Sequence, residues 1–253
     1  MIDVAIAVDA QRIAGKLLLP PGCRGRCPAV LFVHGWGGSQ RRSIGKSKRI
    51  VTRGYACLTF NLRGHARTSG QRDRVTRAQN LRDIIAAYDL LVAQPEVDAA
   101  HVVVVGSSYG GYLATLLTSE RKVRALGLRA PAMYKDDDFD RPKRQLNLDP
   151  DLCAYRRRAL APSDNMVLAA ASRFEGDVLI AESEHDTVIP SPVIANYVHA
   201  FGAAASVRHE VLTGADHALS SEASRRRWGA LLLAWLLERV PPPARLQAVT
   251  RRA

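Results

Sequence analysis

The sequence predicts an α/β fold in which a mostly parallel β-sheet carries helices on both faces. Short apolar runs typical of buried strands alternate with longer segments whose apolar residues recur at helical spacing. The run Val102–Val105 is the clearest strand, and a Gly-x-Ser-x-Gly turn and a helical pattern follow it at once. Such alternation is typical of parallel sheets that are covered on both faces.

In the first half of the chain, glycine and proline clusters separate the expected elements. Two strand-like runs flank a short turn at residues 9–11, which predicts an antiparallel start. Apolar residues from Ala78 to Val92 recur at helical spacing, which predicts an amphipathic helix that ends before Gln94-Pro95. In order, we expect strands at 2–8, 12–19 and 29–33, a basic helix at 41–53, a strand at 55–61, a polar loop at 62–74 and a helix at 76–93.

The second half continues the alternation, with one interruption. Residues 131–173 contain several prolines and no clear strand, and we interpret this segment as a small inserted cap of short helices. We therefore expect a single domain over residues 1–240 and a loose C-terminal tail over residues 241–253. The other expected elements are the valine strand, a helix to about residue 120, strands at 123–129, 178–182 and 207–212, and a final helix around residues 228–236.

Composition limits the classes of partner. Among 253 residues, 36 Lys and Arg stand against 24 Asp and Glu, a formal charge of +12. This excess could indicate affinity for nucleic acid, anionic lipid or an acidic substrate. Since no recognised nucleic-acid motif accompanies it, we interpret it as an arginine-rich surface and expect no nucleic-acid partner.

The chain also lacks the sequence signals of several other classes. No apolar run approaches the roughly 20 residues of a membrane span, and no secretory signal is evident, so we expect a cytoplasmic protein without a membrane span. The four cysteines lack the spacing of a common zinc or redox motif, and no phosphate loop or dinucleotide motif follows a strand. We therefore expect no metal and no organic cofactor. The oligomeric state stays open.

The turn after the valine strand carries a candidate nucleophile, Ser108. The order of strand, Gly-x-Ser-x-Gly and helix is the context of a nucleophile elbow, whose strained turn lifts the serine oxygen clear of the sheet. Gly106 and Gly110 are expected there because a Cβ at either position would crowd the turn. An activated serine attacks carbonyl carbon, which predicts acyl-transfer chemistry.

A serine nucleophile needs a base, and the base needs a group that orients it. Asp186 and His217 follow Ser108 in the required chain order, each just beyond a predicted strand. Because loops at the carboxyl ends of parallel strands share one edge, we expect the three side chains to meet there. Glu182 and Glu184 are rival candidates for the acid, and Asp216 is interpreted as a turn residue.

The oxyanion of such a reaction needs preformed donors. We expect one to be the backbone N–H of Tyr109, directly after the nucleophile, and the other to be the N–H of Trp36 in the glycine-rich loop after an earlier strand. In that loop His34 is interpreted as a structural histidine. The cap residues Tyr134, Tyr155, Lys135, Arg141, Lys143 and Arg144 could bind a substrate carboxylate, but we interpret them as a solvated cap surface.

Together these motifs resemble the α/β-hydrolase fold serine hydrolases, in the branch that contains dienelactone-hydrolase-like esterases and the catalytic domains of some serine peptidases. Asn61 and Ala66 depart from that family's usual loop sequence, and Ser108 replaces the cysteine of true dienelactone hydrolases and the aspartate of dehalogenases. The matching segments are residues 34–38, 61–65, 106–111, 186–190 and 214–217.

The resemblance implies a serine hydrolase that cleaves a small-molecule carboxylic ester, or a related acyl bond, by a Ser-His-Asp acyl-enzyme mechanism. A carboxylesterase-like activity is expected because the cap is modest and no additional domain of the kind found in many peptidases of this branch is evident. Two alternatives stay open: a peptidase or acyltransferase with the same triad, and a non-catalytic binding module on the hydrolase fold.

Overall fold

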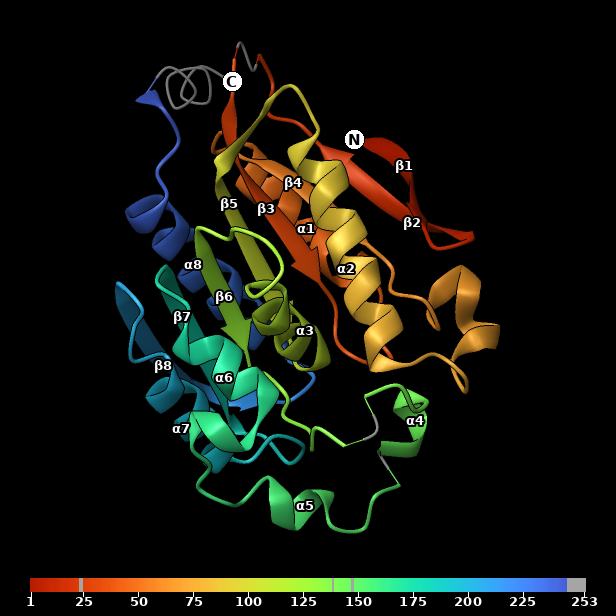
Figure 1. Cartoon of the computed structure of the whole chain (residues 1–253). Coiled ribbons are helices and arrows are strands. Elements are labelled where there is room, and N and C mark those ends of the chain that lie inside the picture. Colours follow the sequence, from red (N-terminus) through yellow and green to blue (C-terminus); the bar gives the residue numbers. More distant parts are fainter. Residues whose placement is uncertain (23–24, 138, 147, 245–253) are drawn as a thin grey trace.

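A central β-sheet organises the molecule, whose computed structural model describes residues 1–22, 25–137, 139–146 and 148–244 (Figure 1). Within these residues the strands are β1 (Ile2–Val8), β2 (Gln11–Leu18), β3 (Cys27–Val33), β4 (Ala56–Phe60), β5 (Val97–Ser107), β6 (Ala125–Arg129), β7 (Asp177–His185) and β8 (Ser206–Asp216). Their order across the sheet is β1-β2-β4-β3-β5-β6-β7-β8. The pairs β1–β2 and β2–β4 are antiparallel and the other five described pairs are parallel, so the predicted mostly parallel sheet is confirmed.

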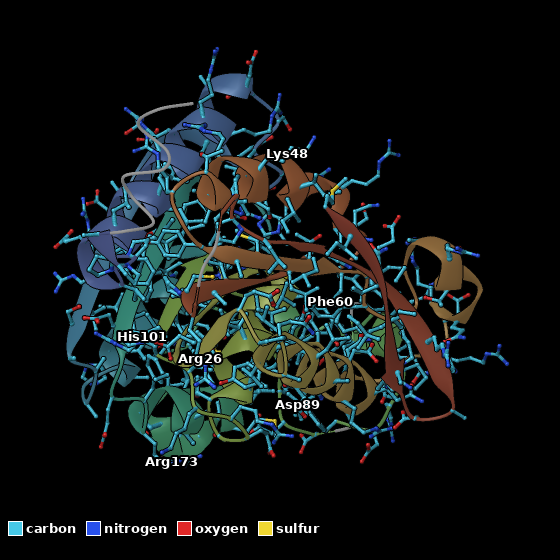
Figure 2. The ribbon with its side chains drawn as sticks, turned by 90° about the horizontal axis from the view of Figure 1, so that it is seen from above. Arg26, Lys48, Phe60, Asp89, His101 and Arg173 are labelled. Carbon is cyan, nitrogen blue, oxygen red and sulfur yellow. The ribbon has the colours of Figure 1, made fainter. Side chains whose placement is uncertain are left out.

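Helices cover both faces of this sheet. The described residues form α1 (Arg41–Val51), α2 (Arg77–Val92), α3 (Tyr109–Leu117), α4 (Lys143–Leu146), α5 (Leu152–Tyr155), α6 (Met166–Ser172), α7 (Ser191–Ala200) and α8 (Glu222–Arg239), with 3₁₀ turns η1 (Ala66–Gln71) and η2 (Pro162–Asp164). One apolar core joins the sheet to α2, α3, α6 and α7, and a second joins it to α1 and α8. Figure 2 shows the two layers, with Phe60 of β4 between Lys48 of α1 and Asp89 of α2.

Capping side chains explain where the long helices begin. Thr76 and Gln79 form a capping box at α2: the Gln79 N–H donates to Thr76 Oγ1 at 3.1 Å, and the Thr76 N–H donates to Gln79 Oε1 at 3.0 Å. Ser221 caps α8 by accepting the Ser224 N–H at 3.0 Å. Both helices were expected from the sequence, whereas α7 was not, and the loop expected at 62–74 contains η1.

The segment between β6 and β7, interpreted above as a cap, contains α4, α5, η2 and α6. Three of its residues, Tyr134, Lys143 and Tyr155, are buried, so the solvated surface expected for them is wrong. Figure 1 shows α4 and α5 beyond the end of the sheet to which the β6 arrowhead points. By contrast, α6 packs against α3 and α7 and so belongs to one of the two helical layers. Of the tail expected at residues 241–253, positions 245–253 lie outside the described residues. None of the described helices has the length and apolarity of a membrane span.

Candidate active site

Ser108 occupies a strained turn between the end of β5 and the start of α3. Its backbone angles are φ 52° and ψ −118°, a conformation that costs an L-residue free energy and is maintained by the surrounding contacts. The Ser108 N–H donates to the carbonyl oxygen of Arg129 at 2.9 Å. Its own carbonyl oxygen accepts the N–H groups of Gly111 at 2.9 Å and Tyr112 at 3.1 Å. The serine is partly exposed at this turn.

Two glycines make the turn sterically possible. A Cβ at Gly106 would lie 2.3 Å from the carbonyl oxygen of Gly110. A Cβ at Gly110 would lie 2.4 Å from the carbonyl oxygen of Val33 and 2.6 Å from that of His34. Because these obstacles are backbone atoms of neighbouring strands and loops, no side-chain rotation can relieve them. The crowding expected at both glycines is confirmed.

Ser108, His217 and Asp186 form one chain of hydrogen bonds. Ser108 Oγ lies 3.1 Å from His217 Nε2, and His217 Nδ1 lies 2.7 Å from Asp186 Oδ2. The geometry fits a neutral imidazole that donates from Nδ1 to the carboxylate and accepts the serine hydroxyl at Nε2. The three residues follow β5, β8 and β7, so the sheet brings together side chains that lie 31 to 109 positions apart in sequence.

Asp186 is anchored as a carboxylate by backbone donors. Its Oδ1 accepts the N–H groups of Val188 at 2.9 Å and Ile189 at 2.8 Å, while Oδ2 faces His217. Burial raises the pKa of this carboxyl, but the hydrogen bonds from His217 and Ile189 outweigh burial and keep the pKa below its ordinary value. The side chain is only 3% exposed, so its charge acts on the imidazole with little screening by water.

The rival acids point elsewhere. Glu182 accepts the Ser191 hydroxyl and lies 2.9 Å from Nε2 of His209. Glu184 accepts the backbone N–H of Gly214 at 2.7 Å. Asp216 accepts the N–H of Ser220 at 2.8 Å, which makes it the turn residue that its position suggests. Among Glu182, Glu184 and Asp186, only Asp186 contacts His217 in the described structure.

Arg129, at the end of β6, is a site residue that the sequence did not suggest. Its carbonyl oxygen accepts the Ser108 N–H at 2.9 Å, and its Nη1 donates to the carbonyl oxygen of His217 at 2.8 Å. Arg129 is 7% exposed, and this burial lowers the pKa of its guanidinium to about 10. Arg129 thus links the Ser108 turn to the His217 loop. The sequence signal that could have indicated Arg129 is its position at the carboxyl end of β6, the strand next to β5.

The loop after β3 lies against Ser108. A Cβ at Gly35 would lie 3.1 Å from the carbonyl oxygen of Ser107 and 3.3 Å from Ser108 Cβ, so any larger residue would require the loop or the turn to shift slightly. The Gly37 N–H donates to Nε2 of His65 at 3.0 Å, and the ring of Trp36 packs edge-on against the ring of His65. These contacts fix the loop that carries the Trp36 N–H. Orientation of that N–H toward an oxyanion stays a prediction.

The second expected donor to the oxyanion is the N–H of Tyr109. Tyr109 is the first residue of α3, and the N–H groups of a first helical turn have no acceptor within the helix. The Tyr109 side chain is fully buried, and its hydroxyl donates to Asn80 Oδ1 at 3.1 Å. Its ring lies 5.6 Å from that of Trp36. The turn is therefore anchored to α2 through a buried hydrogen bond directly beside Ser108.

His34 joins two loops at this edge of the sheet, as expected of a structural histidine. Its Nε2 accepts the Leu62 N–H at 3.1 Å, and its Nδ1 lies 2.8 Å from the Gly35 carbonyl oxygen. Burial, opposed by the Gly35 carbonyl and assisted by His65, lowers the pKa of His34 to about 3. In the same region Asn61 Oδ1 accepts the Gln40 N–H at 3.0 Å. Asn61, which departs from the family's usual loop sequence, therefore has a structural role.

The buried neutral His34 predicts acid sensitivity. Between pH 6.5 and 3 the unfolded chain binds a proton that the folded His34 excludes, so stability falls as pH falls through this window. From pH 7 to pH 5 this histidine should lower the free energy of unfolding by about 2 kcal/mol. Urea titrations should show a smaller pH dependence in His34→Gln, whose amide oxygen can replace the acceptor. The exposed control His199→Gln should match wild type, and an unchanged pH dependence in His34→Gln would contradict the assignment.

Residues 44–241 match the prolyl oligopeptidase family, peptidase S9, which covers more than three quarters of the chain. The chain belongs to the prolyl oligopeptidase family. This membership and the sheet topology identify it as an α/β-hydrolase fold serine hydrolase, in agreement with the sequence prediction. In the described part of the chain, no group of three or more His, Cys, Asp or Glu side chains is arranged as a metal site.

Curated relatives of this family member align over limited lengths. The quorum-quenching protein AidA of Acinetobacter baumannii is 35% identical over 98 residues, covering 37% of this chain and 32% of that protein. Human mitochondrial palmitoyl-protein thioesterase ABHD10 is 23% identical over 195 residues, covering 74% of this chain and 58% of that protein. The chain therefore matches about a third and somewhat more than half, respectively, of these two relatives.

Solved structures share the fold over nearly the whole chain. Est1E from Butyrivibrio proteoclasticus, bound to ferulic acid, has a TM-score of 0.74 at 18% identity, covering 94% of this chain and 99% of its own. The acylaminoacyl peptidase of Pyrococcus horikoshii has a TM-score of 0.71 at 17% identity, covering 95% of this chain and 42% of its own. At such identities the similarity establishes the fold.

Proposed function

We propose that this prolyl oligopeptidase family member hydrolyses a small-molecule carboxylic ester through an acyl-enzyme on Ser108. The observation that carries the proposal is the hydrogen-bond chain from Ser108 Oγ through His217 to Asp186. A serine hydroxyl alone is a weak nucleophile, and a base held within hydrogen-bond distance makes it reactive. A non-catalytic binding protein would have no need of this hydrogen-bond chain or of the strained backbone at Ser108.

In the proposed reaction, His217 takes the proton of Ser108 as Oγ attacks the carbonyl carbon. Asp186 keeps Nδ1 protonated and stabilises the imidazolium that forms. The N–H groups of Trp36 and Tyr109 hold the oxyanion. His217 then donates its proton to the leaving group, water enters, and the same steps in reverse release the acid. Neither a metal nor an organic cofactor takes part.

An ester is the proposed substrate class because alkoxide leaving groups need less assistance than amines, so the triad alone can expel them. The Est1E neighbour, whose structure holds a carboxylic acid, supports this choice, whereas the peptidase and thioesterase relatives support the amide and thioester alternatives. The identity of the acyl acceptor separates a hydrolase from an acyltransferase, since the same acyl-enzyme serves both.

A matched substrate panel tests this proposal. We expect the purified protein to release acid from 4-nitrophenyl acetate and butyrate, with lower kcat/KM for acyl-peptide anilides and for acyl thioesters of the same chain length. Added methanol or glycine amide should divert little product from the free acid. Higher kcat/KM for the anilide would indicate a peptidase, and dominant transfer to the added amine or alcohol would indicate an acyltransferase.

A further inference from the structure

Arginine side chains from three different elements hold the loop that carries His217. This loop, residues 217–220, lies between β8 and α8, and its four successive backbone carbonyl oxygens all accept hydrogen bonds from guanidinium groups. The donors are Arg129 of β6 to His217 at 2.8 Å, Arg42 of α1 to Ala218 at 3.3 Å, and Arg225 of α8 to Leu219 at 2.9 Å and Ser220 at 2.5 Å. The base of the proposed triad is therefore held by the main chain of its loop as well as by its imidazole ring.

The His217 loop is itself a strained turn. The carbonyl oxygen of Asp216 accepts the Leu219 N–H at 3.2 Å, and Asp216 Oδ1 accepts the Ser220 N–H at 2.8 Å. Leu219 has a φ of 51°, in the left-handed region that costs an L-residue free energy. A turn with such a residue keeps its shape only while the surrounding contacts hold it, so the donors to its carbonyl oxygens matter for the position of His217.

Burial separates the three arginines. Arg129 is 7% exposed, whereas Arg42 and Arg225 are exposed. A hydrogen bond that water can replace contributes little to stability, whereas the loss of a donor that is shielded from water leaves its acceptor unpaired at a cost. Arg129 also contacts the carbonyl oxygen of His217 itself, and the two exposed arginines contact only the residues that follow. We therefore expect Arg129 to contribute most to the position of the base.

The guanidinium of Arg129 keeps its charge beside the triad. Burial lowers its pKa to about 10, and the neighbouring charges act in both directions, since Asp186 and Asp216 favour the cation and Arg42 opposes it. At neutral pH the side chain is therefore a cation. A charged donor forms a stronger hydrogen bond than a neutral one, so the bond to the His217 carbonyl oxygen is stronger than an amide or hydroxyl would give.

The same residue also holds the serine. The carbonyl oxygen of Arg129 accepts the Ser108 N–H at 2.9 Å, and β6 pairs with β5 at this point, with Arg129 opposite Ser107. The atoms between which the proton must pass, Ser108 Oγ and His217 Nε2, lie 3.1 Å apart. Both are thus positioned through contacts with Arg129. Such distances are critical, because a misplacement of about 1 Å can lower the rate on the order of 100-fold.

We propose that Arg129 is a positioning residue whose side chain sets the place of His217 against Ser108. This inference rests on the proposed esterase function and adds a residue to its machinery. The guanidinium acts through the backbone of His217. The contact with the Ser108 N–H uses the carbonyl oxygen of Arg129, which any residue supplies. Loss of the side chain should therefore slow the steps in which His217 moves a proton and leave substrate binding unchanged.

Kinetics and an imidazole proton signal test the proposal. Arg129→Met should lower kcat for 4-nitrophenyl acetate about 10- to 100-fold and keep KM within about threefold of wild type. Arg129→Lys retains a charged donor and should recover part of kcat. The matched control Arg225→Met removes an exposed donor to the same loop and should keep kcat within about threefold of wild type. In NMR spectra the His217 Nδ1–H, assigned by its absence in His217→Ala, should exchange with water faster in Arg129→Met than in wild type.

The outcomes separate this inference from the proposed function. A wild-type kcat in Arg129→Met, or an equal loss in Arg225→Met, would overturn the role of Arg129 and leave the esterase proposal standing. Absence of ester turnover by wild type would refute the esterase proposal itself. The proton signal would then decide alone, since equal exchange in wild type and Arg129→Met would overturn the positioning of His217. Should Arg129→Met fail to fold, Arg129→Gln, whose amide is too short to reach the same carbonyl oxygen, replaces it in every comparison.

Discussion

Ser108→Ala is expected to lower kcat for 4-nitrophenyl acetate by about 10⁶-fold, since the other triad members cannot act without the nucleophile. The fold should be retained, because alanine removes only the hydroxyl that contacts His217. Steady-state kinetics and thermal unfolding measure the two effects. The neighbouring control Ser107→Ala should keep activity within about tenfold of wild type. Turnover by Ser108→Ala at the wild-type rate would refute the proposed mechanism.

The strain at Ser108 extends this prediction to stability. Glycine adopts φ 52° and ψ −118° without the cost that a Cβ imposes. Ser108→Gly should therefore be as inactive as Ser108→Ala but more stable than Ser108→Ala by about 1 kcal/mol in urea unfolding. Equal stability of the two variants would show that the turn is not strained at this residue.

Gly110→Ala is expected to cause a large loss of stability. The new Cβ would lie 2.4 Å from the Val33 carbonyl oxygen and 2.6 Å from that of His34, so β3 or α3 must shift. We expect a loss of at least about 3 kcal/mol in the free energy of unfolding, measured by urea titration. The displaced elbow should also reduce ester turnover.

Gly45→Ala is the matched control for this substitution. Gly45 lies within α1, and no atom lies within 4 Å of a Cβ placed there. The same chemical change should therefore stabilise the protein by up to about 1 kcal/mol, because alanine favours helix. If Gly110→Ala were as stable as wild type, the close approach of α3 to β3 would be wrong.

The sequence predicts the sheet and the triad because both depend on short-range patterns. Apolar residues mark most of the strands, and each of Ser108, Asp186 and His217 lies directly after a strand, so chain order and sheet topology place them together. Helix α7 was overlooked although Val193, Ile194 and Tyr197 are buried at helical spacing. The helical spacing of these apolar residues is present in the sequence, so α7 was predictable from it.

The surroundings of the triad could not be predicted in the same way. Arg129 and Lys143 are cations in sequence, and their burial depends on how the His217 loop and the cap segment pack over the sheet. The local sequence around a buried cation does not differ from that around an exposed one. Since most Lys and Arg side chains are exposed, the sequence alone favours exposure. The three-dimensional contacts with Tyr134 and with the elbow are what distinguish these residues.

The most direct test of the central claim is capture of the acyl-enzyme. Rapid acid quench of the protein during turnover of 4-nitrophenyl acetate, followed by peptide mass spectrometry, should find an acetyl group on Ser108. The same modification should accumulate in His217→Ala only far more slowly. Steady ester turnover by a protein whose Ser108 stays unmodified, or acetylation at another residue that vanishes with activity, would contradict the account.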